Sequence, residues 1–204
     1  MSITREFLRH PVRTGAIAAS SPALAEAMTS GLGLERANTV VELGPGTGVF
    51  TRAVLDRLRP GARLTAVEIN PRLAADLRRR FAHAPVEVVE DSAETLAARV
   101  ARPVDVVVSG LPWTVMSDAV QARILDAVSA VLAPEGCFST FAYAHVAWTP
   151  PARRFAAALR ARFAVVERSP VVWPNLPPAF VHRAALPVFS GTEVRRGQSA
   201  PATP

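Results

Sequence analysis

The stretch from residue 39 to residue 59 constrains the fold of this 204-residue chain more than any other part of it. Residues 40–43 are largely apolar, which is typical of a parallel strand buried on both faces. A turn with glycine at every second position, residues 44–48, follows. Apolar residues then recur every four positions, which predicts a helix that buries one face. Strand, glycine turn and helix in this order open a doubly wound α/β domain, in which ligands bind at the carboxyl end of the strand.

The spacing of Gly44, Gly46 and Gly48, together with the preceding Glu42, indicates the class of ligand. Dinucleotide-binding folds use G-x-G-x-x-G and place a pyrophosphate on the helix N-terminus. Here the spacing is G-x-G-x-G, and the Glu42 carboxylate would repel a pyrophosphate but attract a positive charge. S-adenosylmethionine (SAM) carries a sulfonium and an amino group and no phosphate. The pattern therefore favours SAM, and a turn that only packs a helix is the remaining alternative.

Two further predicted strands end in acidic residues. The strand over residues 63–69 ends at Glu68, placed to accept hydrogen bonds from both ribose hydroxyls. The strand over residues 86–89 is followed by Asp91, which can accept the adenine amino group or form a capping box with Glu94. The predicted cofactor site comprises Glu42, Gly44, Gly46, Gly48, Glu68, Ile69, Asp91 and Ser92.

The fourth predicted strand, residues 104–108, leads into the loop at residues 109–113. In a doubly wound sheet this strand adjoins the first one, so its exit loop faces the reactive end of the cofactor. Backbone oxygens of Ser109 and Leu111 and the ring face of Trp113 can hold an amine there. The alternative for Trp113 is packing in the core. Asp105, within the strand, is either structural or part of the site.

Tyr143 is the only tyrosine of the chain and ends the fifth predicted strand, residues 137–143. At the carboxyl end of this strand it can orient the amine. Tyr143 or the nearby His145 can accept the proton that the amine releases.

The remaining elements complete a Rossmann-like α/β fold. Helices are predicted at residues 3–9, from Pro22, from Pro71, at 115–132 and after Thr149, and a final antiparallel pair of strands at 163–167 and 180–186. We expect a mostly parallel seven-stranded sheet with an antiparallel final strand and helices on both faces. The predicted organisation is N-terminal lid and membrane-contact helices at 1–36, a SAM-binding catalytic domain at 37–187 and a disordered tail at 188–204.

Composition limits the remaining classes. No apolar run approaches 18 residues, and we see no secretory signal. The single Cys137 excludes an internal disulfide and a multi-cysteine metal site, so no metal is expected, and it fits a reducing cytoplasm. The net charge is +6, and every basic residue is arginine. This charge permits an anionic partner, either a membrane surface or a nucleic acid.

The chain resembles the bacterial phospholipid N-methyltransferases, which are class I SAM-dependent methyltransferases. The resemblance covers about residues 3–187 and is carried by residues 7–11, 15–21, 42–48, 66–70, 109–112, 141–143 and 175–179 together with Arg183. It implies methylation of phosphatidylethanolamine towards phosphatidylcholine by a cytoplasmic enzyme held peripherally on an anionic membrane surface, with no nucleic acid as partner. Arg5, Arg9 and Arg183 would bind the lipid phosphate. For Arg183 an ion pair at the strand edge is the alternative.

Three other functions stay open at this point. The Leu-Pro-aromatic loop also resembles that of the ribosomal RNA adenine dimethylases, but those enzymes carry an added helical domain for which this chain is too short. A small-molecule methyltransferase can use the same scaffold, because the scaffold does not fix the substrate. A SAM-binding or lipid-surface protein without turnover is the non-enzymatic alternative.

Overall fold

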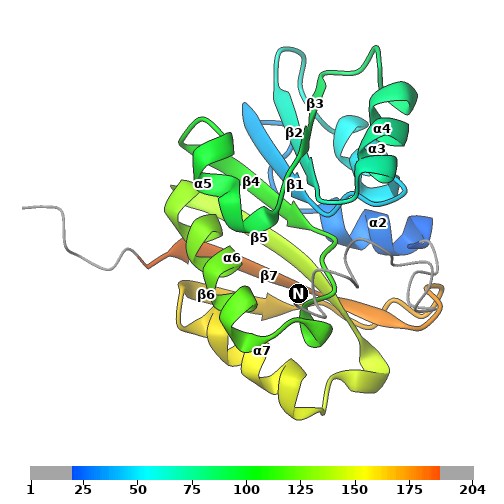
Figure 1. Ribbon diagram of the computed structural model, residues 1–204. Helices are drawn as coiled ribbons and strands as arrows, with labels where there is room; N and C mark the ends of the chain where they lie inside the picture. The colour runs from blue at the N-terminus through cyan, green and yellow to red at the C-terminus, as the bar shows by residue number, and fades with distance from the viewer. Residues whose placement is uncertain (1–19, 189–204) are drawn as a thin grey trace, which may run out of the picture.

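The computed structural model describes residues 20–188, which form one seven-stranded sheet with helices on both faces (Figure 1). The strands are β1 (Thr39–Leu43), β2 (Arg63–Glu68), β3 (Val86–Glu90), β4 (Val104–Ser109), β5 (Leu132–Tyr143), β6 (Phe163–Arg168) and β7 (Ala179–Pro187). The α-helices are α2 (Pro22–Thr29), α3 (Val49–Leu55), α4 (Pro71–Arg80), α5 (Leu96–Arg99), α6 (Asp118–Val131) and α7 (Pro150–Arg160). Short 3-10 helices are η2 (Ala93–Thr95), η3 (Trp113–Val115) and η4 (Ala144–Val146).

The strands lie in the order β3-β2-β1-β4-β5-β7-β6. Every neighbouring pair is parallel except those of β7, which runs antiparallel to both β5 and β6. The predicted mostly parallel sheet with an antiparallel final strand is therefore confirmed. The strand order reverses between β1 and β4, so their carboxyl ends form the switch point at which such folds bind ligands.

Each face of the sheet carries its own hydrophobic core. Helices α2, α3 and α4 cover one face, and α5, α6 and α7 cover the other (Figure 1). Successive residues of β1 point to opposite faces, so Val40 packs under α2 and α3 whereas Val41 packs in the core under α6. Both side chains are completely buried, as expected for a central parallel strand.

Two elements begin three or more residues from the position that the sequence predicts. The long helix predicted from residue 115 begins at Asp118, because the Ser117 hydroxyl caps it and the preceding residues form η3. Strand β5 begins at Leu132 rather than at Cys137, with an irregular register opposite Val104 and Val106. The proline-led starts of α2 and α4 are confirmed, with Ser21 and Asn70 as caps.

The helix predicted at residues 3–9, with Arg5 and Arg9, lies outside the described residues, as does the predicted tail from residue 189 onward. Between residues 20 and 188, no helix combines the length and the apolar character that crossing a bilayer requires.

Candidate active site

The glycine turn after β1 brings two loops together and leaves one glycine open. Gly44 has a φ of +66°, and a Cβ at this position would lie 2.7 Å from Cδ2 of Leu111 in the loop after β4. Gly46 has a φ of +56°, but no heavy atom of residues 20–188 other than its chain neighbours lies within 4 Å of its Cβ position. Both conformations favour glycine, but only Gly46 presents bare backbone to open space. A ligand can therefore approach the turn most closely at Gly46.

The Glu68 carboxylate, at the end of β2, fixes the position of this turn. Its Oε2 accepts a hydrogen bond from the Gly46 N–H (3.1 Å), and its Oε1 accepts one from the Asn70 N–H (2.9 Å). The residue is 4% exposed, and burial raises its pKa above the ordinary value. A carboxylate offers about four lone-pair positions, so further donors can still bind. Glu68 thus lies beside the open glycine with acceptor capacity to spare.

Glu42, on β1, is completely buried behind the turn. Its Oε2 accepts a hydrogen bond from the Thr51 hydroxyl on α3 (2.6 Å). Its Oε1 has no hydrogen-bond partner within residues 20–188. Burial raises the pKa of Glu42 to about 8, and the charge of Glu68 adds to this rise. An unpartnered buried oxygen suits a cationic or hydrogen-bond-donating neighbour.

Asp91 and Ser92, at the end of β3, already bind neighbouring groups. The Asp91 N–H donates to the Glu68 carbonyl (3.1 Å), which places Asp91 beside the end of β2. The Asp91 carboxylate accepts hydrogen bonds from the Ser92 N–H and from Arg99, and the Ser92 N–H contributes most to lowering its pKa. The predicted capping box was wrong, because Ser92 is the N-cap of η2 and Glu94 pairs with an arginine of α6.

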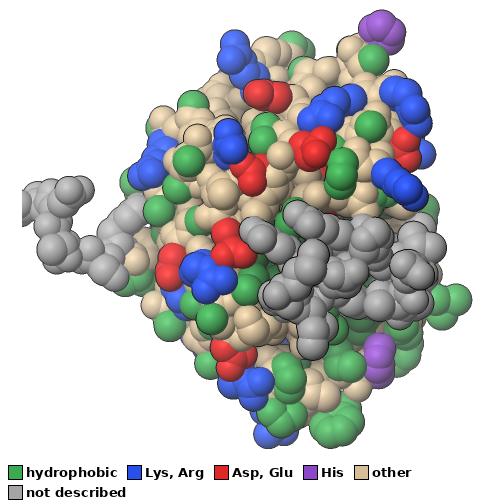
Figure 2. All heavy atoms as spheres, in the orientation of Figure 1, with side chains coloured by type: hydrophobic (Ala, Val, Ile, Leu, Met, Phe, Trp, Pro, Cys, Tyr) green, Lys and Arg blue, Asp and Glu red, His purple; other side chains and the backbone are tan. Residues whose placement is uncertain are grey.

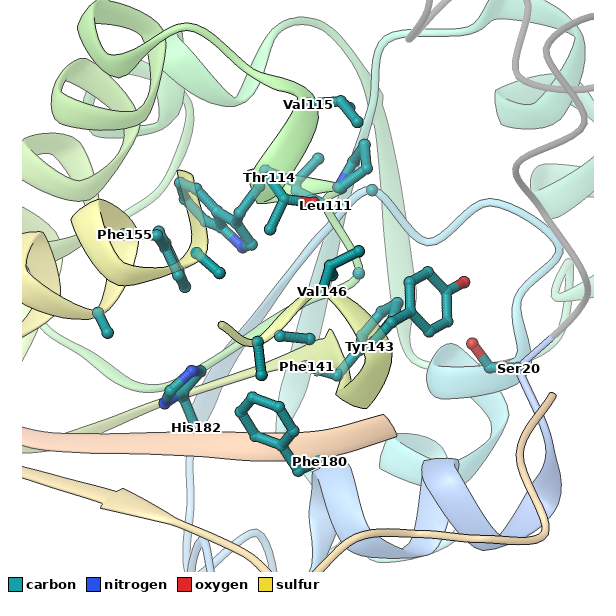
Figure 3. A pocket seen from close by; sticks show the side chains of 18 of the residues that line it. Ser20, Leu111, Thr114, Val115, Phe141, Tyr143, Val146, Phe155, Phe180 and His182 are labelled. Carbon is teal, nitrogen blue, oxygen red and sulfur yellow. The ribbon is translucent and has the colours of Figure 1, made fainter. Parts of the chain in front are cut away.

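A cavity of about 670 Å³ adjoins the glycine turn at the carboxyl ends of β4 and β5 (Figure 3). Its walls come from the turn itself, the loop after β4, the end of β5 with η4, and the space between α7 and the strands β6 and β7. Of the predicted catalytic and substrate-binding residues, Leu111, Trp113, Tyr143 and His145 line it. The acidic residues at the ends of β1, β2 and β3 lie outside its lining. The site thus has two adjoining parts, a turn with acidic neighbours and a cavity.

Known proteins share this architecture. Residues 40–136 match the methyltransferase domain family. An ornithine lipid N-methyltransferase of Singulisphaera acidiphila is 37% identical over 139 residues, which cover 66% of this chain and 72% of the relative. The chain belongs to the class I SAM-dependent methyltransferases.

A solved structure agrees with this assignment in fold. The O-methyltransferase TomG from Streptomyces achromogenes, in complex with SAM, superposes with a TM-score of 0.66 at 17% identity. The superposition covers 91% of this chain and 90% of TomG. A ribosomal RNA small subunit methyltransferase A of Bordetella pertussis is 44% identical, but over only 71 residues, or 35% of this chain and 26% of that relative. The similarity to that relative is therefore limited to one segment of each protein.

The cofactor of the methyltransferase is SAM, and the residues around the glycine turn fit it. Gly46 leaves room for close approach, and Glu68 retains acceptor positions that suit ribose hydroxyls. Glu42 holds a buried oxygen without a partner among the described residues, and a nearby positive charge would stabilise it.

Ser109 and Trp113 are bound into the core more firmly than the sequence predicts. The Ser109 carbonyl accepts a hydrogen bond from the Thr140 hydroxyl (3.0 Å), and Ser109 does not line the cavity. The Trp113 indole donates to the same hydroxyl (2.9 Å), is 2% exposed and stacks on Phe155 at 4.8 Å. The structure thus favours the packing alternative for this ring, and of the two predicted carbonyl-bearing residues only Leu111 lines the cavity.

Tyr143 and His145 lie where the sequence predicts, at the cavity rim. In Figure 3 the Tyr143 ring lies on the same side of the cavity as Ser20, and both residues line the cavity. The ring centroids of Tyr143 and His145 lie 5.9 Å apart, with their planes 28° from parallel. Burial raises the pKa of Tyr143, so its phenol remains protonated at neutral pH. Tyr143 is therefore a hydrogen-bonding group rather than an anionic base.

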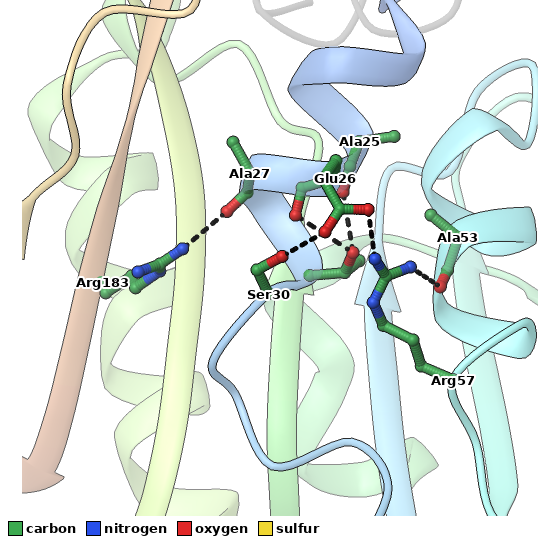
Figure 4. A network of polar contacts seen from close by, with 8 residues as sticks. Ala25, Glu26, Ala27, Ser30, Ala53, Arg57 and Arg183 are labelled. Carbon is green, nitrogen blue, oxygen red and sulfur yellow. Dashed lines mark hydrogen bonds and ion pairs between the residues drawn. The ribbon is translucent and has the colours of Figure 1, made fainter.

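Arg183 lies on the opposite face of the sheet from the cavity. Its guanidinium donates a hydrogen bond to the Ala27 carbonyl of α2 (2.9 Å), as Figure 4 shows. It lines a separate, smaller cavity beside β6 and not the one at the glycine turn. The predicted phosphate contact is therefore not supported, and Arg183 instead anchors α2 to β7. Neither is it the ion pair considered as the alternative, because its partner is a carbonyl.

The sequence reasoning missed the neighbouring His182, which does line the cavity. Residues alternate across β7, so Phe180 and His182 face α7 while Arg183 faces α2. His182 is 8% exposed, and burial, followed by the charges of Arg168 and Arg160, lowers its pKa to about 4. It is neutral at pH 7. The apolar neighbours of His182 at alternate positions are the signal that could have identified it.

Proposed function

We propose that this enzyme methylates the amine of a membrane lipid headgroup, with phosphatidylethanolamine and its methylated derivatives as acceptors and phosphatidylcholine as the end product. The lipid N-methyltransferase of Singulisphaera acidiphila supports a lipid amine as the acceptor class. The observation that carries the proposal is the lining of the cavity beside the glycine turn. This lining is mostly apolar, and its one acidic residue, Glu167, comes from β6, three strands away from β4.

The lining favours an uncharged amine over an ammonium ion. A buried ammonium needs a carboxylate partner, and none lines the cavity near the turn. The neutral amine retains the lone pair that attacks, and it can donate hydrogen bonds to carbonyl and hydroxyl oxygens. The loop at Leu111 and the hydroxyl of Tyr143 supply such oxygens at the cavity wall.

Each polar group at the rim then has a separate role. When bound, SAM supplies an electrophilic methyl group on a sulfonium. Tyr143 orients the amine through its protonated hydroxyl, and the exposed His145 beside it takes the released proton and passes it to solvent. Holding the amine in line contributes much of the acceleration, for which effective molarities allow about 7–11 kcal/mol.

An ornithine lipid is the second candidate acceptor, because the relative with 37% identity is named for it. Both lipids present a primary amine on a short chain, so the same cavity chemistry serves either. Phosphatidylethanolamine carries a phosphate next to the amine, which an ornithine lipid lacks. As part of the same proposal, the enzyme works from the cytoplasm at the membrane surface, because its acceptor resides there.

Transfer of radiolabelled methyl groups from SAM tests the proposal. The enzyme is incubated in parallel with vesicles containing phosphatidylethanolamine, ornithine lipid or neither, with water-soluble amines, and with ribosomal RNA. Label in phosphatidylethanolamine is the expected result, with the Glu68→Ala variant as background. Label in ornithine lipid alone would make that lipid, rather than phosphatidylethanolamine, the acceptor. Label only in a soluble amine or in RNA would contradict the proposal of a lipid acceptor. No label in any sample would support a protein without catalytic activity.

A further inference from the structure

Two loops beside the cavity expose the largest apolar side chains of the described chain. Trp148 follows η4 and is 68% exposed, while Trp173 and Leu176, in the loop before β7, are 72% and 76% exposed. We call these three residues the mouth patch. Exposed tryptophan is costly in water because its large ring is mostly apolar, and large exposed apolar side chains beside a cavity indicate an interaction site.

The two loops belong to one surface. They leave the same end of the β5–β7 pair, where Tyr143 lies opposite Ala179, and the Ala144 N–H donates to the Pro178 carbonyl (2.8 Å). Val146 and Pro177, one from each loop, both line the cavity. Figure 1 shows the loops together beyond the ends of β5 and β7. The mouth patch therefore borders the opening through which an acceptor reaches the site.

Charge is absent from the two segments that form this surface. One residue in five of the chain is charged, yet residues 136–152 and 169–182 contain no Asp, Glu, Lys or Arg. In Figure 2 the lower right of the molecule is accordingly rich in hydrophobic side chains, whereas charged side chains gather elsewhere on this face. An uncharged, tryptophan-bearing surface matches the interfacial layer of a bilayer, in which indole rings are enriched.

Arginines mark the border of the uncharged segments. Arg153 directly follows the first segment, and Arg168 directly precedes the second. Both line the cavity and, within residues 20–188, neither forms an ion pair with a carboxylate. Glu167, beside Arg168, also lines the cavity, so the border is not uniformly positive. Long arginine side chains can hold their charge at the phosphate level while apolar neighbours lie deeper.

We propose that the mouth patch docks on a lipid bilayer, with Trp148, Trp173 and Leu176 in the headgroup layer and Arg153 and Arg168 on lipid phosphates. The cavity then opens directly onto the layer that holds the acceptor amine. The choice of a bilayer as partner rests on the proposed function, whereas the surface itself rests on exposure, charge and position.

Fluorescence tests the docking without any methyl transfer. Vesicles of phosphatidylcholine and phosphatidylglycerol contain no acceptor amine, so a failure of the proposed reaction leaves this result intact. Trp113 is buried, so a change in emission on adding vesicles reports on the two exposed rings. We expect a blue shift and quenching by brominated lipid for the natural chain. A W148F/W173F variant keeps an apolar surface and should bind vesicles without the shift.

Affinity gives the second measurement. The W148S/W173S variant should partition onto the vesicles about tenfold to a hundredfold more weakly, because each ring that enters the bilayer contributes up to about one factor of ten. Arg153→Gln and Arg168→Gln should each weaken binding to anionic vesicles by about fivefold at low salt. Val188→Ser is the matched control, because Val188 is 54% exposed but follows the opposite end of β7. This variant should bind the vesicles as tightly as the natural chain does.

Four results would overturn the docking proposal. Vesicle binding without a change in tryptophan emission would assign the contact to another part of the chain. Unaltered affinity of W148S/W173S, or no vesicle binding by the natural chain, would remove the role of the mouth patch. A blue shift on raising the protein concentration without lipid, with a dimer in sedimentation, would assign the patch to a second copy.

Discussion

At Gly46 the backbone adopts a left-handed conformation, and no other part of the described chain, residues 20–188, fills the space beside it. A Gly46→Ala variant should lose only about 1–2 kcal/mol of unfolding free energy from backbone strain. Its affinity for SAM should fall at least about tenfold, because the methyl group occupies the approach to the turn. Calorimetric titration with SAM and thermal unfolding measure the two effects separately.

Gly61 provides the matched control for this substitution. It has a φ of +84°, and within the part of the chain that the structure describes no heavy atom beyond its chain neighbours lies within 4 Å of its Cβ position. It precedes β2, at the opposite edge of the sheet. Gly61→Ala should show the same loss of stability and bind SAM as the natural chain does. Equal affinities for both variants would mean that the open space at Gly46 is unrelated to the cofactor.

Glu42 gives the protein a dependence of stability on pH. Its pKa rises from 4.5 to about 8 on folding, so the folded state holds the proton more tightly than the unfolded one. This contribution to stability is complete below pH about 4.5 and is lost as the pH rises through 8. As the pH rises across this window, the free energy of unfolding of Glu42→Gln should increase relative to that of the natural chain by about 1 kcal/mol for each pH unit. Melting temperatures of the natural chain and of Glu42→Gln from pH 5 to pH 9 test the trend.

Tyr143 orients the acceptor in the proposed reaction without carrying charge. Tyr143→Phe should lower kcat about 10- to 100-fold, within the range of a single hydrogen-bonding or proton-transfer group, and leave SAM affinity unchanged. Its ring contacts with Phe141 and His145 remain possible in the variant, so the fold should persist. Full turnover in the methyl-transfer assay would exclude a role for the hydroxyl.

At the scale of elements, the sequence alone predicts those helices, strands and turns that depend on residues close to one another in the chain. The apolar run of β1, the glycine turn and the helix that follows depend on near neighbours, so their periodicity and spacing predict them. The acidic ends of β1 and β2 follow from the same units. Their convergence needs only the general rule that parallel strands share one carboxyl edge.

The sequence alone does not predict the position of a side chain that contacts a partner far away in the chain. Trp113 packs in the core because the hydroxyl of Thr140 and the ring of Phe155 receive it, and neither contact is visible along the chain. Arg183 faces α2 rather than the cavity for a similar reason. A one-residue change of register moves a strand side chain to the other face, and the register of β7 is set by β5 and β6.

Asp105 holds strand β1 in place at the edge of the sheet opposite the site. Its Oδ2 accepts the N–H groups of Asn38 (2.7 Å) and Thr39 (3.0 Å), which fixes the start of β1 beside β4. Asp105→Ala should therefore lower the free energy of unfolding by about 2 kcal/mol, the scale of hydrogen bonds to a charged group. SAM affinity should stay unchanged, because the cofactor lies at the other end of β1. Urea denaturation and calorimetry test this, and a large loss of affinity would place Asp105 in the site after all.

For the whole molecule, the decisive property is that its net charge of +6 comes from a chain without lysine. Arginine has the most basic side chain of the amino acids, so its positive charge persists in mildly alkaline solution. Binding to anionic vesicles should accordingly be constant across this mildly alkaline range. It should fall at least about tenfold when salt is raised from 0.1 M to 1 M, because the screening length shrinks from about 10 Å to about 3 Å.

Vesicle sedimentation at fixed salt and varied pH, and then at fixed pH and varied salt, separates these two dependences. Vesicles of phosphatidylcholine alone are the control, since the arginines find no net negative surface on them and binding should respond little to salt. A steep loss of binding between pH 8 and 9.5 would show that a titrating group, rather than the fixed arginine charge, holds the protein on the membrane. Salt-independent binding to the anionic vesicles would leave the apolar mouth patch as the dominant contact.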